Sequence, residues 1–281
     1  MLISGLGSKK QIGLFALLFI AAVMISIVVQ LPANWLLSQP SIKSVIERDI
    51  NQTQQIKITA SRGTIWQGEI DLALHNRTAT NGKVSLGTVG FDLNLLSLLW
   101  ANMSADIHWY LAGSTIATTA DLGMLSSSDN RSIELSDTQG VIKIDELLAK
   151  LNMPSLSRIP ALQNIAGLVA INQLDLVYGL NSRWFSELNA DLQVDGLSIL
   201  NNDFPPIKLD AAFQDKGIVF NLNSEHKAWQ LTGNGSLSPK KLYRFDLSVK
   251  ANSADSLPDW AFLMQKKSAA NYIAKFQGRL F

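Results

Sequence analysis

The side chains that could perform acid–base or metal chemistry are scattered through the sequence. The histidines His75, His108 and His226 are far apart, and none has a second histidine or a carboxylate at the spacing of a helical metal site. Carboxylates such as Asp106 and Asp210 fall on the polar positions of alternating segments, where their ordinary role is to solvate a sheet. We therefore expect no metal site and no catalytic acid–base pair.

Motifs that activate a nucleophile or bind phosphate are also missing from the sequence. It has neither a G-x-S-x-G elbow nor a Walker A loop. Gly233–Gly235 resembles part of a glycine-rich loop, but no helix follows whose N-terminus would bind phosphate, so we expect a tight turn or a β-bulge. The sequence predicts a protein that is not an enzyme and has no cofactor.

Composition excludes further classes of function. The 281 residues carry 24 basic and 23 acidic side chains, a net charge of +1, so no electrostatic argument for a nucleic-acid partner exists. There is no cysteine, which excludes disulfides, thiolate chemistry and zinc–thiolate sites. At 47% apolar residues the chain can bury a real core.

One aromatic residue has an unusual setting. Trp66 lies between Gly63 and Gly68, where the backbone can bend or approach another segment closely. Packing in the core is one interpretation of the ring. The other is that such aromatic residues line an apolar groove, because a one-sided sheet must cover its apolar face with helices, a partner or lipid. Gly63, Trp66 and Gly68 are therefore a candidate interaction motif.

The N-terminal region is apolar enough to cross a membrane. Lys9 and Lys10 precede an almost unbroken apolar run over Ile12–Val29. As a helix this run is roughly 27 Å long, against a hydrocarbon core of about 30 Å. Pro32 and Trp35 follow as the expected exit from the membrane, and the lysines on the other side place the N-terminus in the cytoplasm.

These features predict a cytoplasmic tail over 1–10, a transmembrane helix over 11–31 and a β-rich region over 32–281 on the far side of the membrane. A cleaved signal peptide is the competing interpretation. Its apolar region normally has about 7 to 15 residues and ends in an A-x-A-like site, which this sequence lacks. Two halves of the β-rich region could join near 151–166, where two prolines interrupt the pattern.

Beyond the expected anchor, apolar and polar residues alternate with a period of two. About a dozen such segments, separated by Gly, Asn and Asp, predict a mainly β fold: a long antiparallel meander forming a twisted, one-sided sheet or half-barrel groove. The segments are 55–60, 69–74, 83–95, 105–110, 114–122, 132–135, 141–144, 168–178, 187–199, 207–213, 217–222, 228–237 and 243–251.

Helices are expected to be few. Ser41–Ile50 has apolar residues at helical spacing after a proline, and Asp145–Leu151 is predicted as a helix of two turns capped by Asp145. Ser256–Lys275 is predicted as an amphipathic helical segment that covers an open end of the sheet with its aromatic residues.

These residues resemble a known family, protein N of the type II secretion system of Gram-negative bacteria. The resemblance runs in order through nearly the whole chain. It lies in the segments Leu31–Trp35, Gly63–Gly68, Leu86–Leu93, Gly167–Ile171, Leu209–Leu222, Gly233–Leu237 and Phe276–Leu280.

The resemblance implies a single-span inner-membrane protein with a periplasmic region. It implies a part in exporting folded proteins from the periplasm through an outer-membrane pore. Its contribution would be structural, through contacts with the inner-membrane platform and secretin-associated components. It implies no catalytic residues.

Two other functions stay open on the sequence alone. AsmA-like proteins also begin with one span and continue as a long one-sided sheet, so a periplasmic lipid-binding or lipid-transfer groove is the alternative. A groove lined by apolar residues on every strand, with no helix to cover it, would favour that alternative. An envelope hydrolase is the third hypothesis, which would require histidines or carboxylates to converge in a cleft.

Overall fold

The structure is a computed structural model of the 281-residue chain. It describes residues 30–40, 49–51, 54–76, 82–94, 102–123, 132–151, 165–199 and 202–279, and singly residues 19, 23, 26, 43, 46, 47 and 97. The expected transmembrane helix over 11–31 lies almost entirely outside these residues. Within the part of the chain that is described, no helix is both long and apolar enough to cross a membrane.

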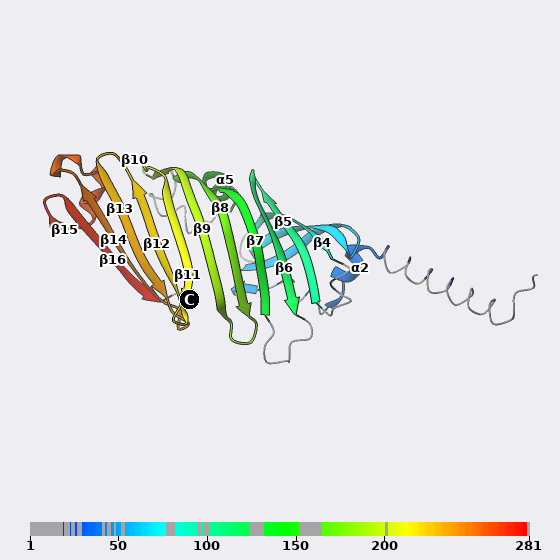
Figure 1. The fold of residues 1–281 in the computed structure, drawn as a ribbon. Coiled ribbons are helices and arrows are strands. Elements are labelled where there is room, and N and C mark those ends of the chain that lie inside the picture. Colours follow the sequence, from blue (N-terminus) through cyan, green and yellow to red (C-terminus); the bar gives the residue numbers. More distant parts are fainter. Residues whose placement is uncertain are drawn as a thin grey trace, which may run out of the picture.

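The described strands form one antiparallel sheet of 16 strands (Figure 1). Neighbours in the sheet follow the chain order, except that β10 pairs only with β9 and that β16 lies between β14 and the edge strand β15. The strands are β1 (Asp49–Asn51), β2 (Gln54–Gly63), β3 (Gln67–Asn76), β4 (Lys83–Leu93), β5 (Asn102–Leu111), β6 (Ser114–Gly123), β7 (Ser132–Lys143), β8 (Ile165–Gly179), β9 (Trp184–Ile199), β10 (Asn202–Asp203), β11 (Ile207–Gln214), β12 (Gly217–Glu225), β13 (Trp229–Leu237), β14 (Leu242–Ala251), β15 (Gln265–Ser268) and β16 (Asn271–Arg279).

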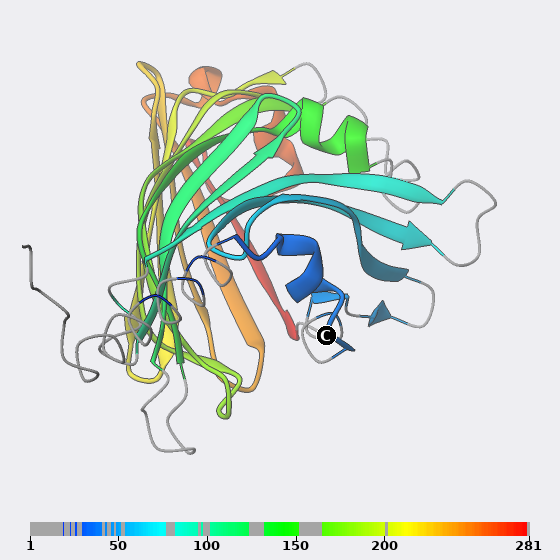
Figure 2. The same cartoon turned by 90° about the vertical axis from the view of Figure 1, so that its right-hand side faces the viewer.

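Helical elements are short and lie at the margins of the sheet. They are α2 (Ala33–Leu37), α5 (Ile144–Leu151) and the 3₁₀ helices η1 (Ala254–Ser256) and η2 (Asp259–Leu263). Figure 2 shows that the sheet curves into an open half-barrel, with α2 (blue) inside the concave side next to the first strands and α5 (green) along one rim. The helix α5 contacts β4, β7 and β8.

The strand register places alternate residues on the two faces. At one end of the concave face Trp229, Leu231 and Val249 are buried against Trp260 and Met264, from the segment between β14 and β15.

A row of directly paired residues on the same face, here called the central row, crosses the sheet from β3 to β16. It consists of Ile70, Val89, Trp109, Ile116, Gly140, Ile171, Leu192, Leu209, Leu222, Gly233, Leu247 and Ala274.

The mainly β fold is thus confirmed, with three local corrections. The two segments expected at 132–135 and 141–144 are one strand, β7, because a bulge near Asp137 reverses the phase of the alternation. Gly233–Gly235 is not a turn but lies inside β13. The segment Ser256–Lys275 does not form the expected helix, because η2 is short and part of the segment lies in β15 and β16. Trp260 does pack against an end of the sheet, as expected.

Candidate functional site

The two sequence motifs singled out above lie in contact. Pro32, from the expected membrane exit, forms an antiparallel bridge with Thr64 in the turn between β2 and β3. The Ile65 N–H donates a hydrogen bond of 2.9 Å to the Leu31 carbonyl. The helix α2 follows immediately and contacts β2. We call this contact between 31–37 and 63–68 the junction.

Glycine is required at both ends of the turn in the junction. Gly63 has a φ of +86°, and a Cβ atom there would lie 2.3 Å from the Gln67 carbonyl oxygen. Gly68 pairs directly with Gly63, and a Cβ atom at Gly68 would lie 2.6 Å from the Arg62 carbonyl oxygen. The motif is therefore a closely packed turn in which a side chain at either glycine would meet backbone atoms.

Trp66 and Trp35 differ in their surroundings. Trp66 is half-buried, and its carbonyl accepts a hydrogen bond of 2.6 Å from the Leu93 N–H, which ties the turn to the end of β4. Trp35 is 50% exposed, although Ala33 and Leu37 of the same short helix are buried. The junction thus buries one side of α2 and leaves the Trp35 ring at the surface.

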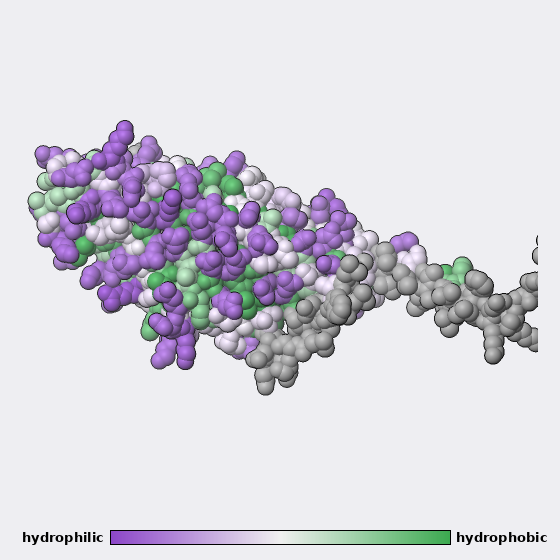
Figure 3. All heavy atoms as spheres, in the orientation of Figure 1, coloured by the Kyte–Doolittle hydropathy of each residue, from purple (hydrophilic) through white to green (hydrophobic). Residues whose placement is uncertain are grey.

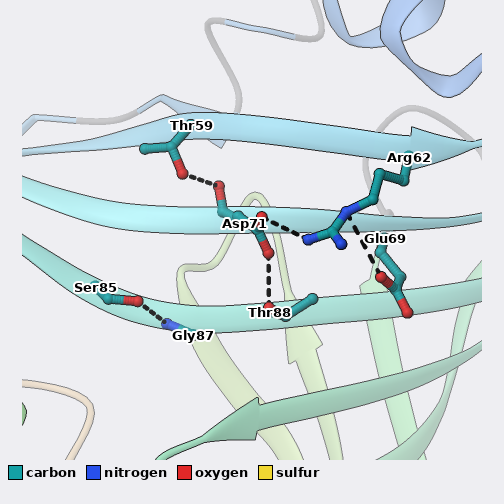
Figure 4. Close-up of polar contacts among 7 residues, drawn as sticks. All are labelled: Thr59, Arg62, Glu69, Asp71, Ser85, Gly87 and Thr88. Carbon is teal, nitrogen blue, oxygen red and sulfur yellow. Dashed lines mark hydrogen bonds and ion pairs between the residues drawn. The ribbon is translucent and has the colours of Figure 1, made fainter.

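A polar network on the other face of β2, β3 and β4 supports this end of the sheet (Figure 4). Asp71 lies at its centre. The Thr88 hydroxyl donates to Asp71 Oδ1 at 2.6 Å, and Arg62 Nη2 donates to Asp71 Oδ2 at 2.9 Å. The hydrogen bond from Thr88 and the Arg62 charge lower the pKa of Asp71 below its ordinary value of 3.8, against an opposing effect of partial burial.

The concave face is unusual in its lack of charged residues. On the described strands from β3 to β14 and on β16, no residue in phase with the central row is Asp, Glu, Lys or Arg. Most of these side chains are half-buried rather than buried. The opposite, convex face, seen in Figure 3, is mainly hydrophilic.

Described helices and 3₁₀ helices pack only at the margins of this face. The buried cluster around Trp229 packs against the segment between β14 and β15, and α5 contacts the strands along one rim. No described segment outside the sheet belongs to the second buried cluster, formed by Ala190, Ala211 and Ile218 with its half-buried neighbours. Within the described part of the chain, therefore, no helix packs over the middle of this face.

The described residues can be searched for groups of side chains that would bind a metal ion or transfer a proton. Among the described residues there is no set of three or more histidine, cysteine or carboxylate side chains that could hold a metal ion. Glu134, Asp175 and Glu187 do line one cavity of about 250 Å³. Both Asp175 oxygens accept hydrogen bonds, from the Asp137 N–H and the Gln173 amide, so this carboxylate holds the bulge of β7.

Sequence reasoning missed one cluster. Phe204, His226, Trp229 and Trp260 come together at one end of the concave face, although the sequence separates them widely. The only signal was aromatic content, and the strand register was needed to bring these residues together.

Comparison with known proteins agrees with the fold. The family model for type II secretion system protein N matches residues 54–260, which include most of the described sheet. Neither curated proteins nor solved structures gave a match. The chain therefore belongs to the protein N family of the type II secretion system.

Proposed function

We propose that the protein is a non-enzymatic accessory component of the type II secretion system, held in the inner membrane by residues 11–31. The family membership carries this proposal. With the tail 1–10 in the cytoplasm, the sheet would lie in the periplasm and contribute to the export of folded proteins across the outer membrane.

The junction would connect the proposed anchor directly to the sheet. The apolar run ends two residues before Leu31, whose carbonyl is bonded to the turn between β2 and β3. A span at 11–31 would therefore lead directly into the sheet without a flexible linker. We propose that the exposed Trp35 ring and the turn at Gly63, Trp66 and Gly68 contact the inner-membrane platform or secretin-associated proteins.

The absence of cysteine makes the proposed topology easy to test. Single variants Ser8→Cys and Ser186→Cys introduce the only thiols of the chain. A maleimide that cannot cross the inner membrane should label the cysteine at 186 but not at 8 when the outer membrane is permeabilised. Labelling at both positions, or at 8 alone, would rule out the proposed orientation.

The secretion role itself is tested by export of a substrate. Cells that lack the protein should retain more of a type II substrate in the periplasm, and the full chain should restore export. A version in which a cleavable signal peptide replaces 1–31 should restore it less well, because the sheet is no longer held at the membrane. Unchanged export without the protein would contradict the proposal.

A second candidate function rests on a different observation, the uncharged concave face. A row of twelve directly paired apolar or glycine residues is the arrangement that a lipid-binding or lipid-transfer groove of the AsmA-like kind needs. Because the first strands lie next to the proposed anchor, this surface would begin close to the bilayer. Lipid that co-purifies with the full chain and is lost when Leu192 or Leu209 is replaced by lysine would support it.

A further inference from the structure

A cavity of about 660 Å³ opens over the neighbouring strands β5, β6, β7 and β8. It lies on the convex face, because its side chains His108 and Tyr110 flank Trp109 of the central row and therefore point the opposite way. Ala117 and Ala170 form part of its floor. Short side chains between longer ones thus produce the depression, whose volume is within the range of roughly 300 to 1,000 Å³ that is usual for small-molecule sites.

Two aromatic rings form one wall of the cavity. His108 and Tyr110 lie on the same side of β5, with ring centroids 6.4 Å apart and planes 26° from parallel. The Tyr110 residue is 49% exposed, and His108 is exposed as well. Aromatic carbon is therefore in contact with water at this wall, and a ligand with an apolar face would gain by displacing that water.

Uncharged hydrogen-bonding groups lie around the floor. The amides of Gln139 and Asn172 and the hydroxyl of Thr115 line the cavity, and all three residues are exposed. The Asn172 amide donates a hydrogen bond of 3.2 Å to Asp191 Oδ1, which fixes its orientation. Within the described part of the chain, the side chains of Gln139 and Thr115 make no hydrogen bond, so their donors and acceptors are available to a ligand.

The lining of the cavity is neutral. Among the described residues that line it there is no Asp, Glu, Lys or Arg, although the convex face around it is mainly hydrophilic (Figure 3). An ionic ligand would lose hydration there without gaining an ion pair. A sugar ring carries C–H groups on its faces and hydroxyls at its edge, so it fits both the aromatic wall and the uncharged polar groups.

We propose that this cavity binds a neutral saccharide, one ring of a glycan chain. The ring would stack on Tyr110, and its hydroxyls would bond with Gln139, Asn172 and Thr115. Because the cavity is open to the convex face, the rest of the glycan can continue over the sheet in either direction. The inference goes beyond the proposed function and requires neither a secretion partner nor lipid.

The test titrates defined oligosaccharides into the purified full chain by isothermal calorimetry. The detergent is lauryldimethylamine oxide, which has no sugar headgroup that could occupy the site. The neutral probes are cellotetraose and the tetramer of N-acetylglucosamine. The native chain should bind at least one of them, and should bind the hyaluronan tetrasaccharide at least ten-fold more weakly, because its carboxylates find no cation in the cavity.

Substitutions then locate the site. Tyr110→Ala should weaken binding of the neutral tetrasaccharide about ten-fold, the upper range for one aromatic contact, whereas Tyr110→Phe should keep the native affinity because it keeps the ring. Gln139→Ala should weaken binding roughly two- to ten-fold through the loss of one or two hydrogen bonds. Asn221→Ala, an exposed amide on the convex face outside the cavity, is the matched control and should bind as the native chain does.

The contrary outcomes are distinct. Failure of both neutral probes to bind the native chain would overturn the inference and leave the proposed function intact. Binding that Tyr110→Ala does not weaken, with circular dichroism showing native strand content, would place the saccharide elsewhere. Equal affinity for the hyaluronan tetrasaccharide would contradict a neutral ligand. Displacement of the saccharide by an equal concentration of an uncharged tetrapeptide of glycine and glutamine would assign the cavity to a peptide instead.

Discussion

At the scale of single residues, the junction depends on glycines. From the sequence, these glycines were expected only to permit a bend or a close approach of the backbone. Gly63 combines a left-handed backbone with backbone atoms close to the position that a Cβ atom would take, whereas Gly196 has a φ of +58° but no heavy atom within 4 Å of that position. Substitutions at these two positions therefore distinguish the cost of backbone strain from the cost of a steric clash.

Replacing each glycine by alanine should give different losses of stability. Gly196→Ala should lower the free energy of unfolding by about 1 kcal/mol, the ordinary cost of a left-handed alanine. Gly63→Ala should cost about 3 kcal/mol or more, because the turn must also move away from the new methyl group. Urea denaturation of the two variants measures both values, and equal losses would contradict the packing of the turn.

Asp71 makes stability at this end of the sheet depend on pH. Its folded pKa lies below its ordinary value of 3.8, so folding favours the ionised carboxylate. This stabilisation is fully present above the ordinary pKa and is lost as the pH falls through the folded pKa.

Asp71→Asn should therefore reduce stability at pH 7 by about 0.5 to 1 kcal/mol, the range of a partly exposed ion pair. The difference between the native chain and the variant should shrink as the pH falls below about 4. Thermal melts of both proteins between pH 3 and pH 7 measure it. A difference that stays constant over this range would show that the carboxylate charge contributes nothing.

At the scale of elements, the alternation of residues was sufficient to predict most strands, and the short helix α5 (Ile144–Leu151) was also predicted, over Asp145–Leu151. The misses have physical causes. Asp137, at a φ of +52°, reverses the phase inside β7, and periodicity cannot reveal a bulge. At Gly235 the Phe245 ring covers the bare backbone, so glycine is tolerated within a strand.

The candidate sites were only partly predictable for a related reason. The sequence indicated the membrane exit and the Gly63–Gly68 motif separately, but their contact depends on the path of the chain between them. The aromatic cluster at Trp229 and Trp260 depends on pairing between strands distant in sequence. Local patterns specify elements, whereas such contacts follow from register and curvature.

The concave face should tolerate polar residues differently at different places across the sheet. Leu192 of the central row is half-buried and outside both buried clusters, whereas Leu231 is 6% exposed beneath the segment between β14 and β15. Leu231→Gln should cost about 3 kcal/mol because it buries an amide. Leu192→Gln should cost about 1 kcal/mol, since the amide stays in contact with water.

Chemical denaturation of these two variants, with Leu192→Ala to correct for lost contact area, measures the difference. Similar costs for both glutamine variants would mean that the central row is covered as thoroughly as the end near Trp229. That result would remove the basis for a lipid groove.

At the scale of the whole molecule, one curved sheet links two surfaces of different chemistry. The junction lies at the β2–β3 end of the sheet, next to the residues proposed to enter the membrane. The aromatic cluster around Trp229 and Trp260 lies toward the other end, at β13 and η2. The edge strand β15 is exposed at all four residues and carries Lys266 and Lys267, which discourages the addition of another strand. Contacts with partners are therefore expected through the junction and the faces of the sheet.

The most direct test of the central claim is photo-crosslinking in living cells at Trp35, with Asn221 on the hydrophilic convex face as the matched exposed control. The account predicts adducts between position 35 and proteins of the type II secretion platform or secretin complex, identified by mass spectrometry and lost when those proteins are deleted. Position 221 should not give these adducts. Identical adducts at both positions, or only lipid adducts at position 35, would contradict a secretion contact at the junction.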